Sequence, residues 1–174
     1  MILQTVLLID SEYVVRYSTV SANMDAKYLT PCIVTAQVQD LQQLIGTPLS
    51  TSLAEKVDDE SIDAEGNELY KELLDEYVKP FLLAATQSEL LISNAVKLRN
   101  SGNMQYLDTN QTNMSMKDVE YLVQHYRDQA AFLGNRVTEY LKCHRTAFPE
   151  LKACGCCNDL RPDAKAEIKI PLYL

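Results

Sequence analysis

The sequence predicts an all-α protein that folds as a single helical bundle of about four to six helices. Apolar residues recur every three or four positions through most of the 174 residues, which is the period of an amphipathic helix. Apolar residues make up 47% and charged residues 23% of the chain, so it can bury a core without disulfides or metal. No internal repeat or domain linker interrupts residues 1–174, and we therefore expect one domain.

The first third of the chain predicts three helices. Ser11 is suited to cap a short helix that reaches about Val20. Thr30-Pro31 has the form of an N-cap followed by a proline at the first helical position, and Gly46 is placed to end that helix. After Pro48, apolar residues four positions apart predict a further short helix.

The middle of the chain predicts an acidic connection, a long helix and a polar loop. Residues 58–66 have the composition of a loop, and an apolar periodic pattern then runs from residue 67 to about residue 99. Pro80 lies inside that pattern and is expected to kink or divide the helix, because proline removes a donor and clashes one turn back. Residues 100–114 are rich in asparagine and predict a polar loop or a hairpin around Met104 to Leu107.

The last third predicts the longest helix and then an irregular C-terminal arm. Ser115 and Asp118 resemble a capping box, and the helix that they open runs to about residue 142, a length of roughly 40 Å. The regular pattern is lost in residues 150–174. Residues 168–174 alternate like a strand but have no partner nearby in the sequence, so we expect this extended arm to pair elsewhere.

The negative charge is concentrated in one segment. The chain has a net charge of −8, and residues 55–76 carry ten acidic side chains against two lysines, so the remainder sums to zero. One interpretation is a solvated loop and helix start, since acidic residues favour a helix N-terminus. The other is a surface that repels nucleic acid or binds a basic partner. The candidate residues of that surface are Asp58, Asp59, Glu60, Asp63 and Glu65.

No enzyme signature is present in the sequence. The chain holds two histidines, and neither stands in a nucleophilic relay; glycine patterns for a P-loop or a dinucleotide site are also missing. His125 has polar neighbours on its helix, and we expect it to be exposed and structural. No segment is apolar enough to span a membrane and the N-terminus is a poor signal peptide, so we expect a soluble, intracellular chain.

A group of cysteines with one histidine forms a weak candidate metal site. Adjacent ligands on one helix point about 100° apart, and a C-x-C-C spacing is not that of a structural zinc site. A disulfide is an alternative, but we favour reduced cysteines in a loop, because a cytosol keeps thiols reduced. We therefore expect no cofactor. The candidate ligands are Cys143, His144, Cys154, Cys156 and Cys157.

Several short segments stand in a recognisable order along the chain. They are Ser11 to Ser18, Asn23-Met24-Asp25, Leu29 to Gln37, Leu44-Ile45-Gly46, Val78-Lys79-Pro80, Asp118 to Leu122 and Phe148-Pro149-Glu150. In this order the chain resembles the head–tail connector (neck or ring) proteins of tailed phages and prophages of Bacteroidetes, including ring proteins of crAss-like phages. The similarity covers roughly residues 8 to 150 and depends on order and spacing. The cysteine-rich segment from Cys154 to Cys157 departs from the family pattern.

The resemblance implies a structural virion protein and not an enzyme. Proteins of that class are helical and assemble into a ring, commonly twelvefold, beneath the portal, where they extend the DNA channel and dock the tail. This chain would then bind copies of itself, the portal protein and other neck or tail proteins. Double-stranded DNA would pass through without specific binding. The protein would be made in the bacterial cytoplasm and reside in the virion.

Two segments are candidate contacts to a neighbouring subunit or to the portal, through strand addition. Two other functions stay open: an intracellular helical adaptor that binds a basic partner through the acidic segment, and a metal- or redox-dependent helical protein that uses the cysteine group. The candidate contact residues are Met104, Tyr106 and Leu107 in the polar loop and Ile168, Ile170, Pro171, Leu172, Tyr173 and Leu174 in the arm.

Overall fold

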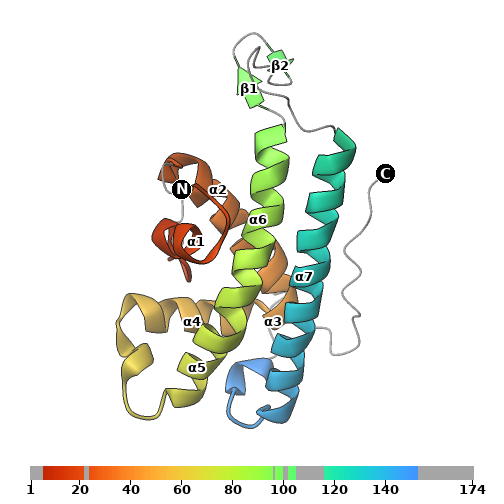
Figure 1. Cartoon of the computed structure of the whole chain (residues 1–174). Helices are drawn as coiled ribbons and strands as arrows, with labels where there is room; N and C mark the ends of the chain where they lie inside the picture. The colour runs from red at the N-terminus through yellow and green to blue at the C-terminus, as the bar shows by residue number, and fades with distance from the viewer. Residues whose placement is uncertain (1–5, 22–23, 96, 100–101, 105–115, 153–174) are drawn as a thin grey trace.

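The computed structural model describes residues 6–21, 24–95, 97–99, 102–104 and 116–152, and these residues form the predicted all-α bundle (Figure 1). Two of its helices contain a π-helical stretch. In chain order the elements are α1 (Ser11–Tyr17), α2 (Ala26–Thr35) continuing through η1 (Ala36–Leu41) into α3 (Gln42–Ile45), α4 (Thr47–Asp58), η2 (Ser61–Asp63), α5 (Glu68–Glu72) continuing through η3 (Leu73–Val78) into α6 (Lys79–Ala95), β1 (Lys97–Arg99), β2 (Gly102–Met104), α7 (Met116–Cys143) and η4 (Pro149–Lys152).

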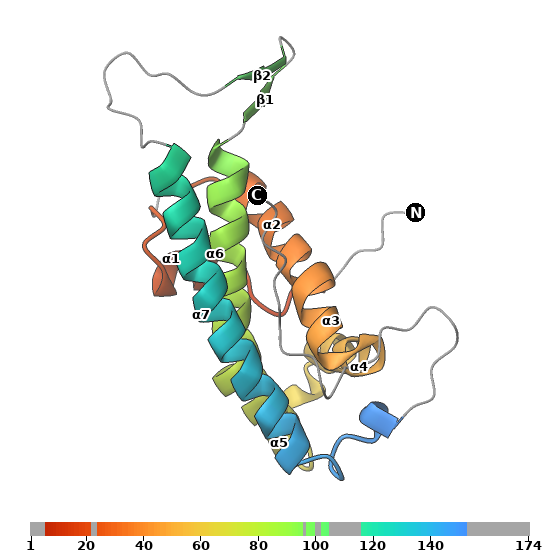
Figure 2. The ribbon, with the colours of Figure 1, turned by 90° about the vertical axis from the view of Figure 1, so that its right-hand side faces the viewer.

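The long helices α6 and α7 lie side by side and form the spine of the bundle (Figures 1 and 2). The helix formed by α2, η1 and α3 packs across α6, and α4 lies near the end of the bundle where α5 begins. The β1–β2 hairpin stands at the opposite end, beyond the last turn of α6. The connection between α4 and α5 and the hairpin are therefore at opposite ends of the bundle.

The first two helices begin at aspartates, which corrects the predicted caps. The Oδ1 atom of Asp10 accepts from the backbone N–H of Tyr13 at 2.7 Å, so Asp10 and not Ser11 caps α1. In the same way Asp25 caps α2 by accepting from Lys27 at 3.0 Å. Helix α2 therefore starts five residues before the predicted position, and Pro31 lies inside it at the cost of one backbone hydrogen bond.

Gly46 separates α3 from α4 as predicted. Its backbone has φ 83° and ψ 154°, a conformation that disfavours side chains with a Cβ, and its N–H donates to the carbonyl of Gln42 at 3.0 Å. Helix α4 follows at once with Pro48 in its first turn, where the missing N–H removes no intrahelical bond. The short helix predicted after Pro48 is confirmed, and it begins at Thr47, one residue before the proline.

Pro80 does not divide the chain into two helices. The stretch η3 directly before it is π-helical, and the N–H of Lys79 donates to the carbonyl of Leu74, five residues back. The wider turn makes room for the proline ring, because the carbonyls on that side are no longer spaced for i→i−4 bonding. The predicted division is therefore wrong, because one continuous run of helical residues passes through α5, η3 and α6.

The C-terminal half largely follows its sequence pattern. Helix α7 spans Met116–Cys143, which confirms the predicted helix, while its proposed cap at Ser115 lies outside the described residues. The hairpin comes earlier than predicted: β1 pairs with β2 so that Lys97 faces Met104 and Arg99 faces Gly102. The predicted helix included residues 97–99. A run of only three residues fits the period of a helix and the period of a strand equally well, so the sequence pattern could not distinguish them.

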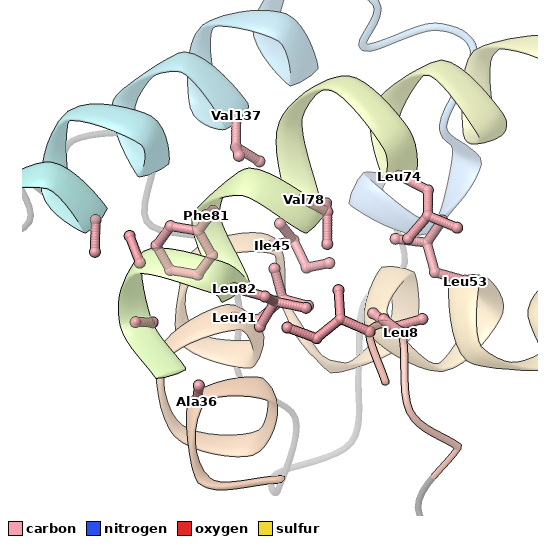
Figure 3. Packing of buried hydrophobic residues seen from close by; sticks show 14 of the residues in the cluster. Leu8, Ala36, Leu41, Ile45, Leu53, Leu74, Val78, Phe81, Leu82 and Val137 are labelled. Carbon is pink, nitrogen blue, oxygen red and sulfur yellow. The ribbon is translucent and has the colours of Figure 1, made fainter. Parts of the chain in front are cut away.

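One hydrophobic core connects all the helices. Figure 3 shows Leu41, Ile45, Val78 and Leu82 meeting between the two halves of the chain, with Val137 of α7 closing one side. Each fully buried side chain of this size contributes roughly 1.5–3 kcal/mol. The largest fully buried side chains are Phe148, Leu29, Ile33, Leu41, Ile45, Leu49, Leu53, Leu73, Leu82, Val14, Val78 and Val137.

The non-helical segment before α1 is held by a buried glutamine. The Oε1 atom of Gln37 accepts from the N–H of Leu8 at 3.0 Å, and its Nε2 atom donates to the carbonyl of Val6 at 2.7 Å. The amide thus bonds two backbone groups as a neighbouring strand would. Leu8 and Ile9 can then enter the core without leaving these backbone groups unsatisfied.

Candidate functional surfaces

The five candidate acidic residues lie together on one exposed connection between α4 and α5. Asp58 ends α4, Asp59 and Glu60 follow it, Asp63 belongs to η2, and Glu65 precedes the turn at Gly66. All five side chains are exposed. Glu60 and Gly66 both have positive φ, 57° and 96°, which turns the chain sharply twice within a few residues. The residues that the sequence proposed as an acidic surface therefore do share one end of the bundle (Figure 1).

Side-chain hydrogen bonds fix the shape of this acidic connection. The Nδ2 atom of Asn67 donates to the carbonyl of Ser61 at 2.8 Å, and its Oδ1 atom accepts from Nζ of Lys56 at 3.0 Å. Lys71 forms an ion pair with Asp63, which raises the pKa of the lysine through hydrogen bonding and charge. The carboxylates are consequently presented on a folded turn and not on a loose tail.

The half-buried carboxylate of Glu150 joins the base of the acidic connection to the rest of the protein. Oε1 of Glu150 accepts from Oγ of Ser52 at 2.8 Å, and both its carboxylate oxygens accept from the hydroxyl of Tyr70. Burial, followed by the hydrogen bond and charge of Glu150, raises the pKa of Tyr70 to about 12. One side chain in η4 thus connects α4 with α5.

Aromatic side chains fill the space around this carboxylate. The fully buried Phe148 meets the ring of Tyr70 edge to face, with centroids 4.9 Å apart. On the neighbouring turn, the hydroxyl of Tyr140 donates to Oε2 of Glu72 at 3.0 Å. Burial and that carboxylate raise the pKa of Tyr140. The polar and aromatic contacts together hold α5 against the end of α7.

The candidate metal ligands are only partly within the described residues. Cys143 is exposed at the end of α7, and His144 follows it with its ring against Tyr140, 4.3 Å between centroids. The Nδ1 atom of His144 lies 3.1 Å from the Tyr140 carbonyl, so the tautomer with a proton on Nδ1 donates there. In the part of the chain that the structure describes, no three His, Cys, Asp or Glu side chains group to hold a metal ion. Cys154, Cys156 and Cys157 lie outside that part.

Most of the candidate contact residues also lie outside the described residues. Met104 is the last residue of β2, so it belongs to the hairpin at the end of the bundle away from the acidic connection. Tyr106 and Leu107 are outside, as is the whole arm: Ile168, Ile170, Pro171, Leu172, Tyr173 and Leu174. The structure therefore brings Met104 to one end of the body and leaves the arm as a sequence-based prediction.

The outer face of α7 carries a stripe of side chains that the sequence analysis did not single out. Tyr121 is 73% exposed and Phe132 is 64% exposed, although both are large and aromatic. His125, which the sequence predicted to be exposed, lies between them and is exposed. Tyr121 and Phe132 are eleven residues, or about three turns, apart and so point the same way. The eleven-residue spacing of these two aromatic residues was the feature of the sequence that could have revealed the stripe.

Comparison with known proteins places the chain in a family. Among the described residues, no helix is both long and apolar enough to cross a membrane. No curated protein and no solved structure matches the chain. Residues 41–161 match the Family of unknown function (DUF6712), a range that starts at the end of η1 and includes α4, the α5–α6 helix and α7. Because this match covers more than half of its length, the chain belongs to the Family of unknown function (DUF6712).

Proposed function

We propose that the protein is a structural subunit of a tailed phage particle, where it forms a ring beneath the portal, extends the DNA channel and links the head to the tail. The ordered segments shared with head–tail connector proteins support this proposal. A ring subunit also needs a rigid body with distinct ends, and the bundle has an acidic connection at one end and a hairpin at the other. No enzymatic activity and no cofactor is part of this function.

The observation that carries the proposal is the concentration of charge. Residues 55–76 contain the whole net charge of −8, and the exposed turn within them is held in shape by Asn67, Lys56 and Lys71. A wall of fixed carboxylates repels DNA phosphates over about one Debye length, roughly 8–10 Å. Such a wall lets a duplex pass without binding, which a DNA channel requires.

Assembly in this proposal uses a cyclic, head-to-tail contact between identical subunits. The arm residues 168–174 and the hairpin that ends at Met104 would extend that contact to the next subunit or to the portal through strand addition. The partners would be further copies in a ring, commonly of twelve, the portal protein and other neck or tail proteins. The protein would then be found in the virion.

Neutralising the acidic turn tests the channel role directly. In particles that carry Asp58→Asn, Glu60→Gln and Glu65→Gln together, we expect normal assembly but slowed DNA passage during packaging and ejection, because the wall no longer repels phosphate. The matched control removes three exposed carboxylates elsewhere, with Glu12→Gln, Glu120→Gln and Glu139→Gln. Equal DNA release rates in the two triple variants would contradict a channel-lining role.

A second candidate function is an intracellular helical adaptor that binds a basic partner through the same acidic turn. The exposure of all five candidate carboxylates on a preformed turn favours it, because a rigid charged surface loses little entropy on binding. Salt-sensitive binding of a basic protein that the acidic triple variant loses, together with absence from phage particles, would support the adaptor over the connector.

A further inference from the structure

The outer face of α7 presents four exposed side chains at the spacing of a helix–helix seam. They are Tyr121, His125, Asp128 and Phe132, separated by four, three and four residues, which places them in one stripe along the helix. The opposite face of α7 supplies Val137 to the core, and α6 covers that side (Figures 1 and 2). Helix α7 therefore has a second, outward seam that carries two large aromatic rings.

We propose that two copies of the chain associate through this seam, with their α7 helices antiparallel about a twofold axis between His125 and Asp128. In that register Tyr121 of each copy meets Phe132 of the second copy, and His125 meets Asp128 of the second copy. All four layers are then complementary, two that pair aromatic rings and two that pair a histidine with a carboxylate. A parallel arrangement would instead place Asp128 against Asp128, so the charges select the antiparallel one.

The residues beside the seam are compatible with this pairing. Gln124, Ala131, Leu122 and Gln129 flank it and carry no charge, so no like charges oppose each other across the contact. The Nε2 atom of Gln124 donates to Oδ1 of Asp128 at 2.7 Å, which holds the carboxylate in place and leaves its second oxygen for a partner. The acceptor for the histidine of the second copy is therefore already oriented.

The contact is small, so we expect the association to be weak and reversible. Two tyrosines and two phenylalanines supply most of the apolar area, at about 150–250 Å² for each fully buried ring. That total falls within the range of weak, reversible interfaces. A twofold contact closes on itself, so it describes the free protein in solution and stands independently of the proposed ring.

Sedimentation velocity of the full chain over a wide concentration range tests the proposal. We expect a reversible monomer–dimer equilibrium, and we expect Tyr121→Ser or Phe132→Ser to weaken it about tenfold or more, since aromatic rings dominate small contacts. The matched control is Tyr28→Ser, which removes an aromatic ring of 58% exposure from α2 and should leave the dimer unchanged. Circular dichroism confirms that each variant is folded.

A charge exchange distinguishes the antiparallel seam from any other contact. His125→Asp alone sets two carboxylates against each other and should weaken the dimer about tenfold. The double variant His125→Asp with Asp128→His restores both pairs and should recover the wild-type association constant. Loss of folding cannot produce that recovery.

Three results would overturn the proposal. The first is a chain that stays monomeric at several hundred micromolar. The second is a dimer whose association constant the seam variants leave unchanged or the double exchange fails to restore. The third is cross-links within a monomer between Tyr121 or Phe132 and residues 153–174, which would show that the chain covers its own seam.

Discussion

The hydroxyl of Tyr70 donates to both carboxylate oxygens of Glu150, at 3.0 and 2.9 Å, although the two residues are 80 positions apart. Tyr70 belongs to α5, which follows the acidic connection, and Glu150 belongs to η4, which follows α7. The contact therefore joins α5, beside the acidic connection, to η4, the short helix after α7. Because a single hydroxyl makes this contact, its contribution to the free energy of unfolding can be measured by removing that hydroxyl.

Removal of the Tyr70 hydroxyl should destabilise the protein. In Tyr70→Phe, Glu150 keeps the hydrogen bond from Ser52 but loses the tyrosine donor, and we expect the free energy of unfolding to fall by about 1–2 kcal/mol. Urea denaturation of both proteins measures the difference. Tyr28→Phe is the control, because Tyr28 is exposed and should lose almost nothing. Equal unfolding free energies for the Tyr70 variant and the wild type would contradict the role of this contact.

Loss of the Gln37 amide should free the N-terminal segment. Gln37→Ala leaves the buried N–H of Leu8 and the carbonyl of Val6 without their partner, so we expect a loss of about 2–3 kcal/mol and faster hydrogen exchange at Leu8. Native-state hydrogen exchange measures the exchange rate of the Leu8 amide by itself. Gln39→Ala, an exposed change in the same helix, serves as the control. Unaltered protection at Leu8 would show that the core, and not the amide, holds the segment.

Stability should depend on the protonation of Asp40. The pKa of the Asp40 carboxyl is raised to about 6, mainly by desolvation and to a smaller extent by the negative charge of Glu89. The positive charge of Arg127 lowers the pKa and offsets part of this rise. The folded state therefore binds this proton more tightly than the unfolded state does. The resulting stability is fully present below about pH 4 and is lost as the pH rises through about 6.

Asp40→Asn should consequently stabilise the protein at pH 8 and have little effect at pH 4. Asp40 is an exposed residue although neighbouring groups crowd its carboxyl, so solvent screening limits the gain to about 1 kcal/mol. Thermal unfolding across pH 4–8 measures it, with Glu120→Gln as an exposed control. A gain of the same size at both ends of this range would argue against a raised pKa.

The proposed arm predicts a separation of folding from assembly. A chain that lacks residues 168–174 should keep the helical content and unfolding midpoint of the full chain, because the core of the described residues is built from side chains between Leu7 and Leu151. It should nevertheless fail to join phage particles. Normal incorporation of the shortened chain would remove the arm from the proposed contact.

Strong, local patterns predicted much of the fold. The apolar repeat of α7 continues over more than seven turns, so its limits follow from the sequence, and Gly46 marks a helix end because few other residues tolerate its φ. The first caps were wrong for a physical reason. Asp10 and Ser11 are both good caps, and only the packing of the following helix decides between them.

Long-range contacts were beyond the reach of the sequence. Nothing near Gln37 indicates that its amide bonds Val6 and Leu8, and the wide turn before Pro80 cannot be distinguished from a kink without the packed helices. The acidic surface was predictable because its five carboxylates are close neighbours in the sequence. The outer seam of α7 was missed although the spacing of Tyr121 and Phe132 was visible in the sequence, because large aromatic side chains are more often part of a core.

The most direct test of the proposed connector function is quantitative mass spectrometry of phage particles purified from cells that produce this protein. A ring beneath the portal predicts a fixed stoichiometry of about a dozen copies in each particle, in constant ratio to the portal protein. Absence of the protein from purified particles, or a ratio that varies between preparations, would contradict it.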